Sequence, residues 1–169
     1  NRNKRVIYVN EFSQTVGASV RVGYSVLPQK YADAARELKG RMTLGQSWLE
    51  QEVLALFISE GYFDKHLQRL RVHYKGRRDC LIDALRENFG NPRLSGTESG
   101  LHLVWNLPQD APDAVAIELR ARDVGVGVYA LSQAASYSFG SSAPQNALVL
   151  GYSALHERQI RTAIRRLKT

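Results

Sequence analysis

The sequence predicts an α/β fold, an α+β sandwich in which helices cover a mixed sheet. Segments rich in Val and Tyr alternate along the chain with segments of helical hydrophobic period. The chain contains no internal repeat and no low-complexity tract. Its 169 residues, 44% of them hydrophobic, are enough to bury a core without disulfides or structural metals. Together these observations favour a folded globular chain of about one domain or slightly more.

Two strands and two helices are expected in the first sixty residues. Residues 5–9 and 20–27 read as strands, separated by the small, polar residues 13–19. Pro28 ends the second strand, because proline cannot donate a ladder hydrogen bond. Helices are predicted over residues 29–38, with Gly40 as a stop, and over residues 44–60.

A long helix is predicted from Tyr62 to Phe89. Phe63, Leu67, Leu70 and Tyr74 recur at helical spacing, and Gly90-Asn91-Pro92 is a helix-ending cluster. A helix of this length is typical of a connection between two lobes.

The last eighty residues predict a compact mixed unit. Leu101, Leu103 and Trp105 alternate with more polar residues, as in a half-buried strand. A helix from Asp110 to about Arg122 follows, then a strand over residues 124–128, a Ser- and Gly-rich loop over 132–144 and a strand over 147–152. Ser153 is the predicted cap of the last helix.

The net charge of +7 raises the question of nucleic-acid binding. Six Lys or Arg residues and no acid lie between Lys65 and Arg78, and a second basic cluster lies between Arg158 and Lys168. Both clusters interleave with helical apolar spacing, which favours the solvated faces of two amphipathic helices over a phosphate-binding surface. A basic interaction module or nucleic-acid-binding module remains a third hypothesis.

Residue spacing alone predicts no active site. The four His residues are scattered and lack neighbouring ligands, so no metal site is expected. No GxSxG or GxGxxG pattern is present. Cys80 is the single cysteine, which excludes an internal disulfide framework. We expect it to be a buried thiol. With no membrane-spanning stretch, we expect a cytoplasmic protein without a membrane partner.

Several motifs, in order along the chain, resemble a known family. The segment Phe12-Ser13-Gln14-Thr15, with Arg21-Val22-Gly23-Tyr24 after it, resembles the lysine-bearing Phe-Ser-Lys-Thr and Arg-x-Gly-Tyr motif of MocR-type bacterial regulators, members of the GntR superfamily. The likeness continues through residues 62–80, 99–103, 125–132 and 148–155. It therefore extends from one end of the chain to the other.

The resemblance implies the C-terminal part of an aminotransferase-like effector domain of fold type I, class I/II. Residues 1–61 would be a remnant of the large cofactor-binding lobe, residues 62–90 a connecting helix and residues 91–169 the small lobe. It also implies a homodimer, pyridoxal phosphate as the family cofactor, an unknown small-molecule effector, and DNA contact through a domain absent from this sequence.

Three residues depart from the family pattern. Gln14 occupies the lysine position, and a carboxamide cannot form a Schiff base with pyridoxal phosphate. Glu11 replaces a hydroxyl that serves the cofactor phosphate, which a carboxylate would repel. Val149 stands where many members carry an Arg for the substrate carboxylate. The resemblance therefore implies a catalytically inactive domain with no covalently bound cofactor.

Two retained residues, Ser13 and Arg21, match cofactor-binding positions of the family. Arg21 could contact a phosphate, or it could form a structural ion pair with Glu11. The second hypothesis for the whole chain is a class I aminotransferase, or a pyridoxal-phosphate-dependent sensor, whose lysine was lost or replaced by engineering.

Overall fold

The computed structural model of the chain describes residues 5–17, 19–42, 48–133 and 146–168. The chain divides into two compact units, residues 1–70 and 71–169. Helix α3 (Tyr62–Phe89) begins in the first unit and ends in the second. The bounds of α3 match the sequence prediction, and a mixed α/β architecture is confirmed.

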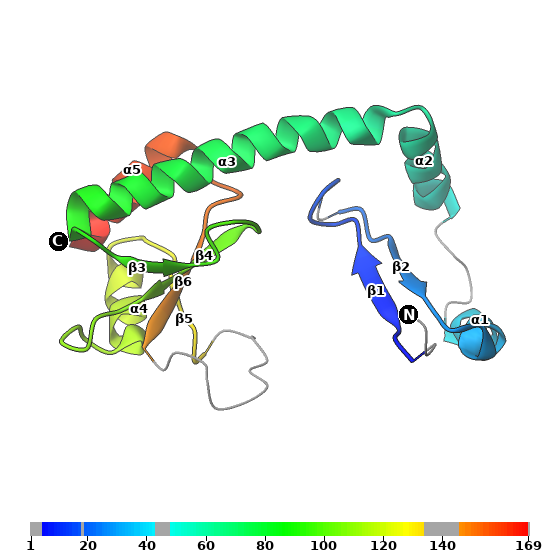
Figure 1. Cartoon of the computed structure of the whole chain (residues 1–169), viewed down its shortest axis with the longest axis horizontal. Coiled ribbons are helices and arrows are strands. Elements are labelled where there is room, and N and C mark those ends of the chain that lie inside the picture. The colour runs from blue at the N-terminus through cyan, green and yellow to red at the C-terminus, as the bar shows by residue number, and fades with distance from the viewer. Residues whose placement is uncertain (1–4, 18, 43–47, 134–145, 169) are drawn as a thin grey trace. The chain divides into compact units, whose positions relative to one another are not determined.

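The first unit contains a two-stranded antiparallel sheet and helices (Figure 1). Strand β1 (Tyr8–Glu11) pairs with β2 (Gly23–Val26), so that Tyr8 lies opposite Val26 and Glu11 opposite Gly23. Helices α1 (Gln29–Met42) and α2 (Trp48–Ser59) follow. The prediction that Gly40 stops the first helix was wrong, because α1 runs through it to Met42. Residues 43–47, the start of the second predicted helix, lie outside the described residues.

Little of the first unit is buried. Every residue of β1 and β2 is exposed, and α1 buries no residue. Leu54 is the one buried residue described in α2. Large apolar side chains of this unit are more than half exposed, among them Val9, Trp48, Leu49, Val53 and Leu56. A two-stranded sheet of this kind depends on further packing for its stability.

The second unit is built on a four-stranded antiparallel sheet of order β3-β4-β6-β5. Its strands are β3 (Arg93–Ser95), β4 (His102–Asn106), β5 (Tyr129–Ala130) and β6 (Ala147–Gly151). Leu103 lies opposite Leu150 and Trp105 opposite Leu148, and all four side chains are buried. Val104 and Val149, which point to the other face, are only half-buried. The alternation predicted for β4 is confirmed.

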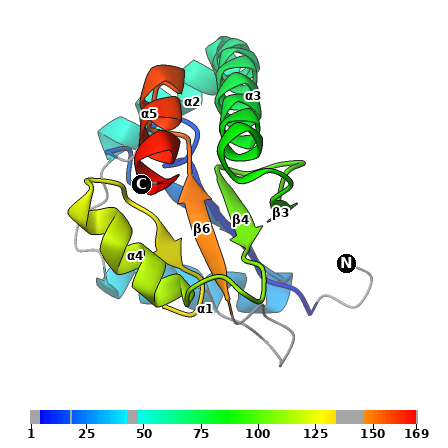
Figure 2. The ribbon, with the colours of Figure 1, turned by 90° about the vertical axis from the view of Figure 1, so that its left-hand side faces the viewer.

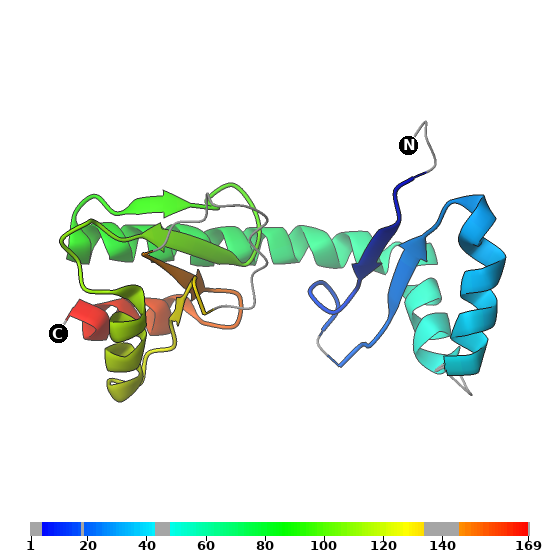
Figure 3. The same ribbon diagram turned by 90° about the horizontal axis from the view of Figure 1, so that it is seen from below.

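Helices α3, α4 (Ala114–Asp123) and α5 (Glu157–Lys168) supply the other side of this core. Figures 2 and 3 show α5 beside the C-terminal half of α3. Ile160 and Ile164 of α5 are buried with Leu81 and Leu85 of α3, while Arg161 pairs with Glu87 at 3.0 Å between the same two helices. The basic residues of α5 are exposed while Ile160 and Ile164 are buried, as predicted for an amphipathic helix.

The start and end of α4 differ from the prediction. Asp110 lies in a turn, and the cap is Asp113, whose carboxylate accepts a hydrogen bond from the Val115 N–H at 2.9 Å. At the other end, the Val126 N–H bonds to the Ala121 carbonyl and the Gly125 N–H to the Arg122 carbonyl, with Gly125 at φ 71°. This is the pattern of a Schellman cap. The predicted strand over residues 124–128 was wrong for this reason, and β5 starts later, at Tyr129.

Two further differences concern β3 and α5. Strand β3, of three residues, was not predicted from the sequence. Ser153 does not cap α5, which begins at Glu157; the His156 N–H is satisfied instead by the Gln159 side chain at 2.8 Å. Most of the predicted loop over residues 132–144 lies outside the described residues.

Candidate functional site

The turn that follows β1 presents the residues of the Phe-Ser-Gln-Thr motif. The Phe12 N–H bonds to the Val22 carbonyl at 3.0 Å, and the Phe12 carbonyl accepts from the N–H groups of Thr15 and Val16. The Phe12 ring is 5.6 Å from the Tyr24 ring and 5.9 Å from the Phe63 ring, measured between centroids. The backbone and one aromatic anchor therefore hold the turn, and Gln14 at its tip is exposed.

The hydroxyl of Ser13 is directed at protein acceptors. Its Oγ lies 3.2 Å from Glu11 Oε2 and 3.4 Å from the Val20 carbonyl oxygen. One hydroxyl carries one proton, so these two acceptors compete for it. An anion brought to this hydroxyl would also meet the Glu11 carboxylate, which repels negative charge.

Arg21 is brought to the same part of the chain, just before β2, and is exposed. Within the described part of the chain it forms no ion pair, so the alternative of an Arg21–Glu11 pair was wrong. Glu11 is engaged by Ser13 instead, which lies two residues away on the same turn.

His66 also contacts this turn, a contact that was not predicted from the sequence. Its Nε2 lies 2.7 Å from the Thr15 carbonyl oxygen, and its ring packs edge-on to Phe57 with centroids 6.0 Å apart. A carbonyl oxygen can only accept, so Nε2 donates in this contact. Fifty-one residues separate the two partners. Because the two residues are so far apart in the sequence, no local sequence pattern could have predicted this contact.

The remaining residues noted in the sequence lie in the second unit. Val149 is half-buried in β6, opposite Val104 and Tyr129. Cys80 is buried in α3, with its Sγ 3.6 Å from the Glu157 carbonyl oxygen, and burial raises the pKa of its thiol. A raised pKa lowers the thiolate fraction at neutral pH, which does not suit a nucleophile.

Neither metal binding nor membrane insertion finds support among the described residues. No group of three or more His, Cys, Asp or Glu side chains in that part of the chain could hold a metal ion. No helix within the same residues is long and apolar enough to cross a bilayer.

Comparison with known proteins connects this geometry to a family. The sequence matches the family model for aminotransferase class I and II over residues 1–167. The chain belongs to the class I and II aminotransferase family. Solved members share its fold: a kynurenine aminotransferase from Pyrococcus horikoshii is 25% identical, with a TM-score of 0.83 over 99% of this chain and 41% of its own. The α-aminoadipate aminotransferase LysN from Thermus thermophilus gives a TM-score of 0.81 at 24% identity, over 96% of this chain and 41% of its own.

Curated relatives of the chain are regulators. The HTH-type transcriptional regulator YhdI of Bacillus subtilis is 33% identical over 99% of this chain and 35% of its own length. The probable rhizopine catabolism regulatory protein MocR of Rhizobium meliloti is 31% identical over 99% of this chain and 33% of its own. The chain thus spans about a third of the length of these relatives and about two fifths of the solved aminotransferases.

Pyridoxal phosphate is the cofactor of this family, and the residues of the turn do not fit its covalent attachment. The turn contains no lysine, and the carboxamide of Gln14 is not a nucleophile for an aldehyde. The Ser13 hydroxyl contacts the Glu11 carboxylate, which would oppose a phosphate there. The nearest following lysines, Lys30 and Lys39, lie on α1.

Proposed function

We propose that this chain is the aminotransferase-like effector and dimerisation domain of a cytoplasmic, bacterial MocR-type transcriptional regulator, and that it performs no transamination. Two facts taken together support the proposal. A transcriptional regulator aligns with 99% of the chain, and Gln14 stands in the turn in place of a lysine. A regulator keeps the fold as a binding scaffold, so the loss of the reactive amine does not abolish its role.

The individual residues support this assignment in the following way. Gln14 takes the position of the Schiff-base lysine, and Ser13 and Arg21 take the positions of phosphate contacts. Ser13 is engaged by Glu11, whereas Arg21 is exposed. On this basis any pyridoxal phosphate that binds does so without a covalent bond.

The proposed organisation assigns residues 1–61 to the large lobe, 62–90 to the connecting helix and 91–169 to the small lobe. Dimerisation is supported by the exposed apolar side chains of the first unit, such as Val9, Trp48 and Val53. The helix-turn-helix named in the relatives would belong to sequence outside these 169 residues.

DNA binding tests the regulatory half of the proposal. We expect the full-length protein to shift duplex DNA in a mobility assay, and the 169-residue chain to leave the same DNA unshifted at matched salt. Binding of DNA by this chain alone, falling steeply as salt rises, would support a basic nucleic-acid module instead.

The Gln14→Lys variant of the full-length protein tests the state of the pocket. If the pocket has decayed around Glu11, the variant that has been treated with pyridoxal phosphate and freed of unbound cofactor shows no visible absorption band beyond that of the native protein treated in the same way. A double variant, Gln14→Lys with Glu11→Ser, then separates the two causes, because it removes the opposing carboxylate as well. A visible band in the single variant would favour the alternative of an aminotransferase or sensor with a recently lost lysine.

A further inference from the structure

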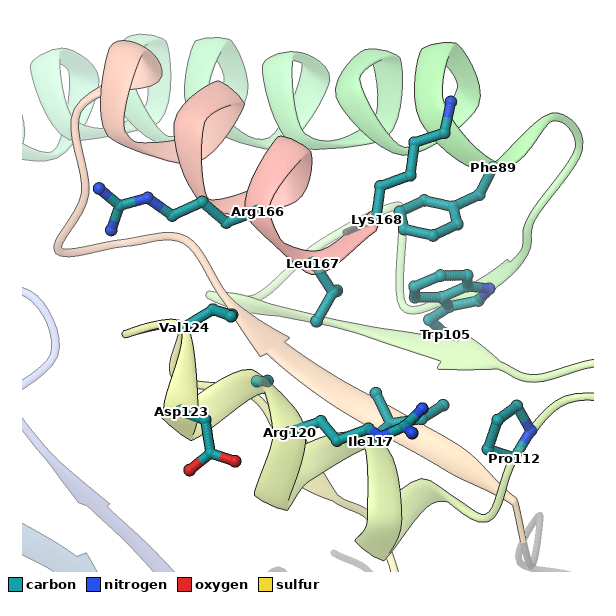
Figure 4. A pocket seen from close by; sticks show the side chains of 11 residues that line it. Phe89, Trp105, Pro112, Ile117, Arg120, Asp123, Val124, Arg166, Leu167 and Lys168 are labelled. Carbon is teal, nitrogen blue, oxygen red and sulfur yellow. The ribbon is translucent and has the colours of Figure 1, made fainter.

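The second unit contains a cavity that no part of the proposed function uses. It has a volume of about 520 Å³ and opens between α4, α5 and the end of α3, above strand β4 (Figure 4). Pockets for small organic ligands have volumes in this range. The cavity lies entirely within the second unit.

Its floor is apolar and includes two aromatic rings. Phe89 and Trp105 lie with their ring centroids 4.7 Å apart at an angle of 56°. Ile117 and Leu167 extend the apolar lining from α4 and α5. Figure 4 shows Leu167 between the two helices, with the ring pair on one side of it. A flat or branched hydrocarbon body would find complementary contacts here.

Trp105 brings a polar donor to this apolar lining. It is 7% exposed, yet its indole N–H has no hydrogen-bond partner among the described residues. In Figure 4 the indole nitrogen lies on the side of the Trp105 ring that is away from Leu167. Trp105, Phe89 and Ile117 line the cavity and an adjoining one of similar size.

The rim of the cavity is cationic. Arg120 lies in the last turn of α4, and Arg166 and Lys168 lie in the last turn of α5. Arg120 and Lys168 are exposed and form no ion pair with another residue that the structure describes. One carboxylate, Asp123, also lines the cavity, at the far side from the ring pair (Figure 4). Three cationic residues and one acidic residue therefore line the cavity.

We infer that this cavity binds a small organic anion with an aromatic or branched apolar body. The body packs on Phe89, Trp105, Ile117 and Leu167, and the positive charge of Arg120 and Lys168 at the rim attracts the carboxylate. Charge-assisted contacts of this kind are stronger than neutral ones, so the charge of the ligand contributes to its recognition. The inference does not depend on the regulatory role proposed above.

Trp105 can report on occupancy of the cavity. The chain has two Trp residues, and the other, Trp48, is 71% exposed in the first unit. In a Trp48→Phe variant, titration with phenylbutyrate is expected to change Trp105 emission in a saturable way. Phenylbutanol has the same ring and nearly the same length but no charge. Its affinity should be lower than that of phenylbutyrate by a factor of about five or more.

Two matched double variants distinguish a specific role of the rim cations in binding from a general effect of net charge. In the same background, Arg120→Ala with Lys168→Ala should weaken phenylbutyrate binding about fivefold or more. Arg71→Ala with Lys75→Ala removes the same two charge types from exposed positions of α3 and should leave binding unchanged. If the rim cations serve only to complement their helix dipoles, their removal lowers the unfolding midpoint but not the affinity.

Three results would overturn the inference. They are an unchanged Trp105 emission with phenylbutyrate in a protein shown to be folded by circular dichroism, equal affinity for the acid and the alcohol, and equal loss of affinity in the two double variants.

Discussion

At the scale of single residues, Glu118 shows how one buried carboxylate joins two elements of the second unit. Its Oε2 accepts a hydrogen bond from the Ala130 N–H at 2.7 Å, which links α4 to β5. Its Oε1 lies 3.4 Å from the Arg122 guanidinium. Glu118 is 9% exposed, so its hydrogen bonds take the place of those that water would make.

We expect Glu118→Ala to lower the free energy of unfolding by about 1–3 kcal/mol, because the Ala130 N–H loses its acceptor inside the protein. Glu118→Gln keeps a side chain of the same length with an acceptor oxygen at its end. It should therefore lower the free energy of unfolding by less than the alanine variant does. Urea unfolding followed by circular dichroism measures both. Equal losses in the two variants would mean that the contact with Ala130 does not stabilise the unit.

Tyr152 predicts how stability responds to alkaline pH. Its hydroxyl donates to the Gly100 carbonyl at 2.7 Å, and burial raises the pKa of the phenol. The folded state therefore holds this proton more tightly than the unfolded state, whose phenol titrates at about pH 10. Stability from this group is fully present below that pH and is lost as pH rises through the folded pKa.

The Tyr152→Phe variant should lose about 0.5–1.5 kcal/mol at neutral pH, since Gly100 loses its donor. Above pH of about 10 its free energy of unfolding should fall less steeply than that of the native chain. Burial also raises the pKa of the Cys80 thiol, so Cys80 too lowers the free energy of unfolding as the pH rises, starting at a lower pH than Tyr152. This effect is the same in the native chain and in the variant. Identical slopes above this pH would show that Tyr152 does not contribute.

At the scale of elements, the amphipathic helix α5 is a direct consequence of its sequence period. Ile160 and Ile164 are 2% and 3% exposed, whereas Arg158 is exposed on the same helix. We expect Ile164→Ala to destabilise the chain by about 2–4 kcal/mol through the cavity it leaves. The control variant Arg158→Ala should change stability by less than about 0.5 kcal/mol. Similar losses in both would contradict the packing of α5 on α3.

Helices were more predictable from the sequence than short strands and caps. The period of α3 and the Gly-Asn-Pro cluster after it define both of its ends, and Leu81 and Leu85 are buried as the spacing requires. The alternation in β4 identified its buried side chains. In these cases the signal is local and repeats over several residues.

The misplaced elements depend on contacts that the local sequence does not reveal. Val124 to Val128 alternates like a strand, but Gly125 adopts a left-handed conformation that caps α4. Strand β3 is only three residues long and exists because it pairs with β4. At the candidate site, the motif located Ser13, Gln14 and Arg21 in one turn region. The contact between His66 and Thr15 could not have been predicted, because their partnership is set by tertiary packing.

At the scale of the whole molecule, the two units differ in how much they bury. The second unit has a continuous core that includes Leu85, Leu103 and Leu148, all 0% exposed. In the first unit both strands are exposed throughout. Few buried contacts and exposed backbone hydrogen bonds are features of regions that open easily.

Hydrogen exchange should therefore distinguish the units. We expect the amides of β1 and β2 to exchange faster than those of β4 and β6 in the isolated chain. Exchange of the β1 and β2 amides should slow as the chain concentration rises, if exposed apolar residues such as Val9 and Val53 mediate self-association. Sedimentation gives the parallel readout, and a monomer at all concentrations would contradict the proposed dimerisation role.

Transamination by the full-length protein decides whether the fold still performs the chemistry of its family. The native protein is supplied with pyridoxal phosphate, a panel of amino acids and 2-oxoglutarate, and glutamate formation is compared with the rate for pyridoxal phosphate alone. With Gln14 in the turn, we predict no rate above that background. Turnover by the native protein above the background would contradict the assignment of this chain as a non-catalytic effector domain.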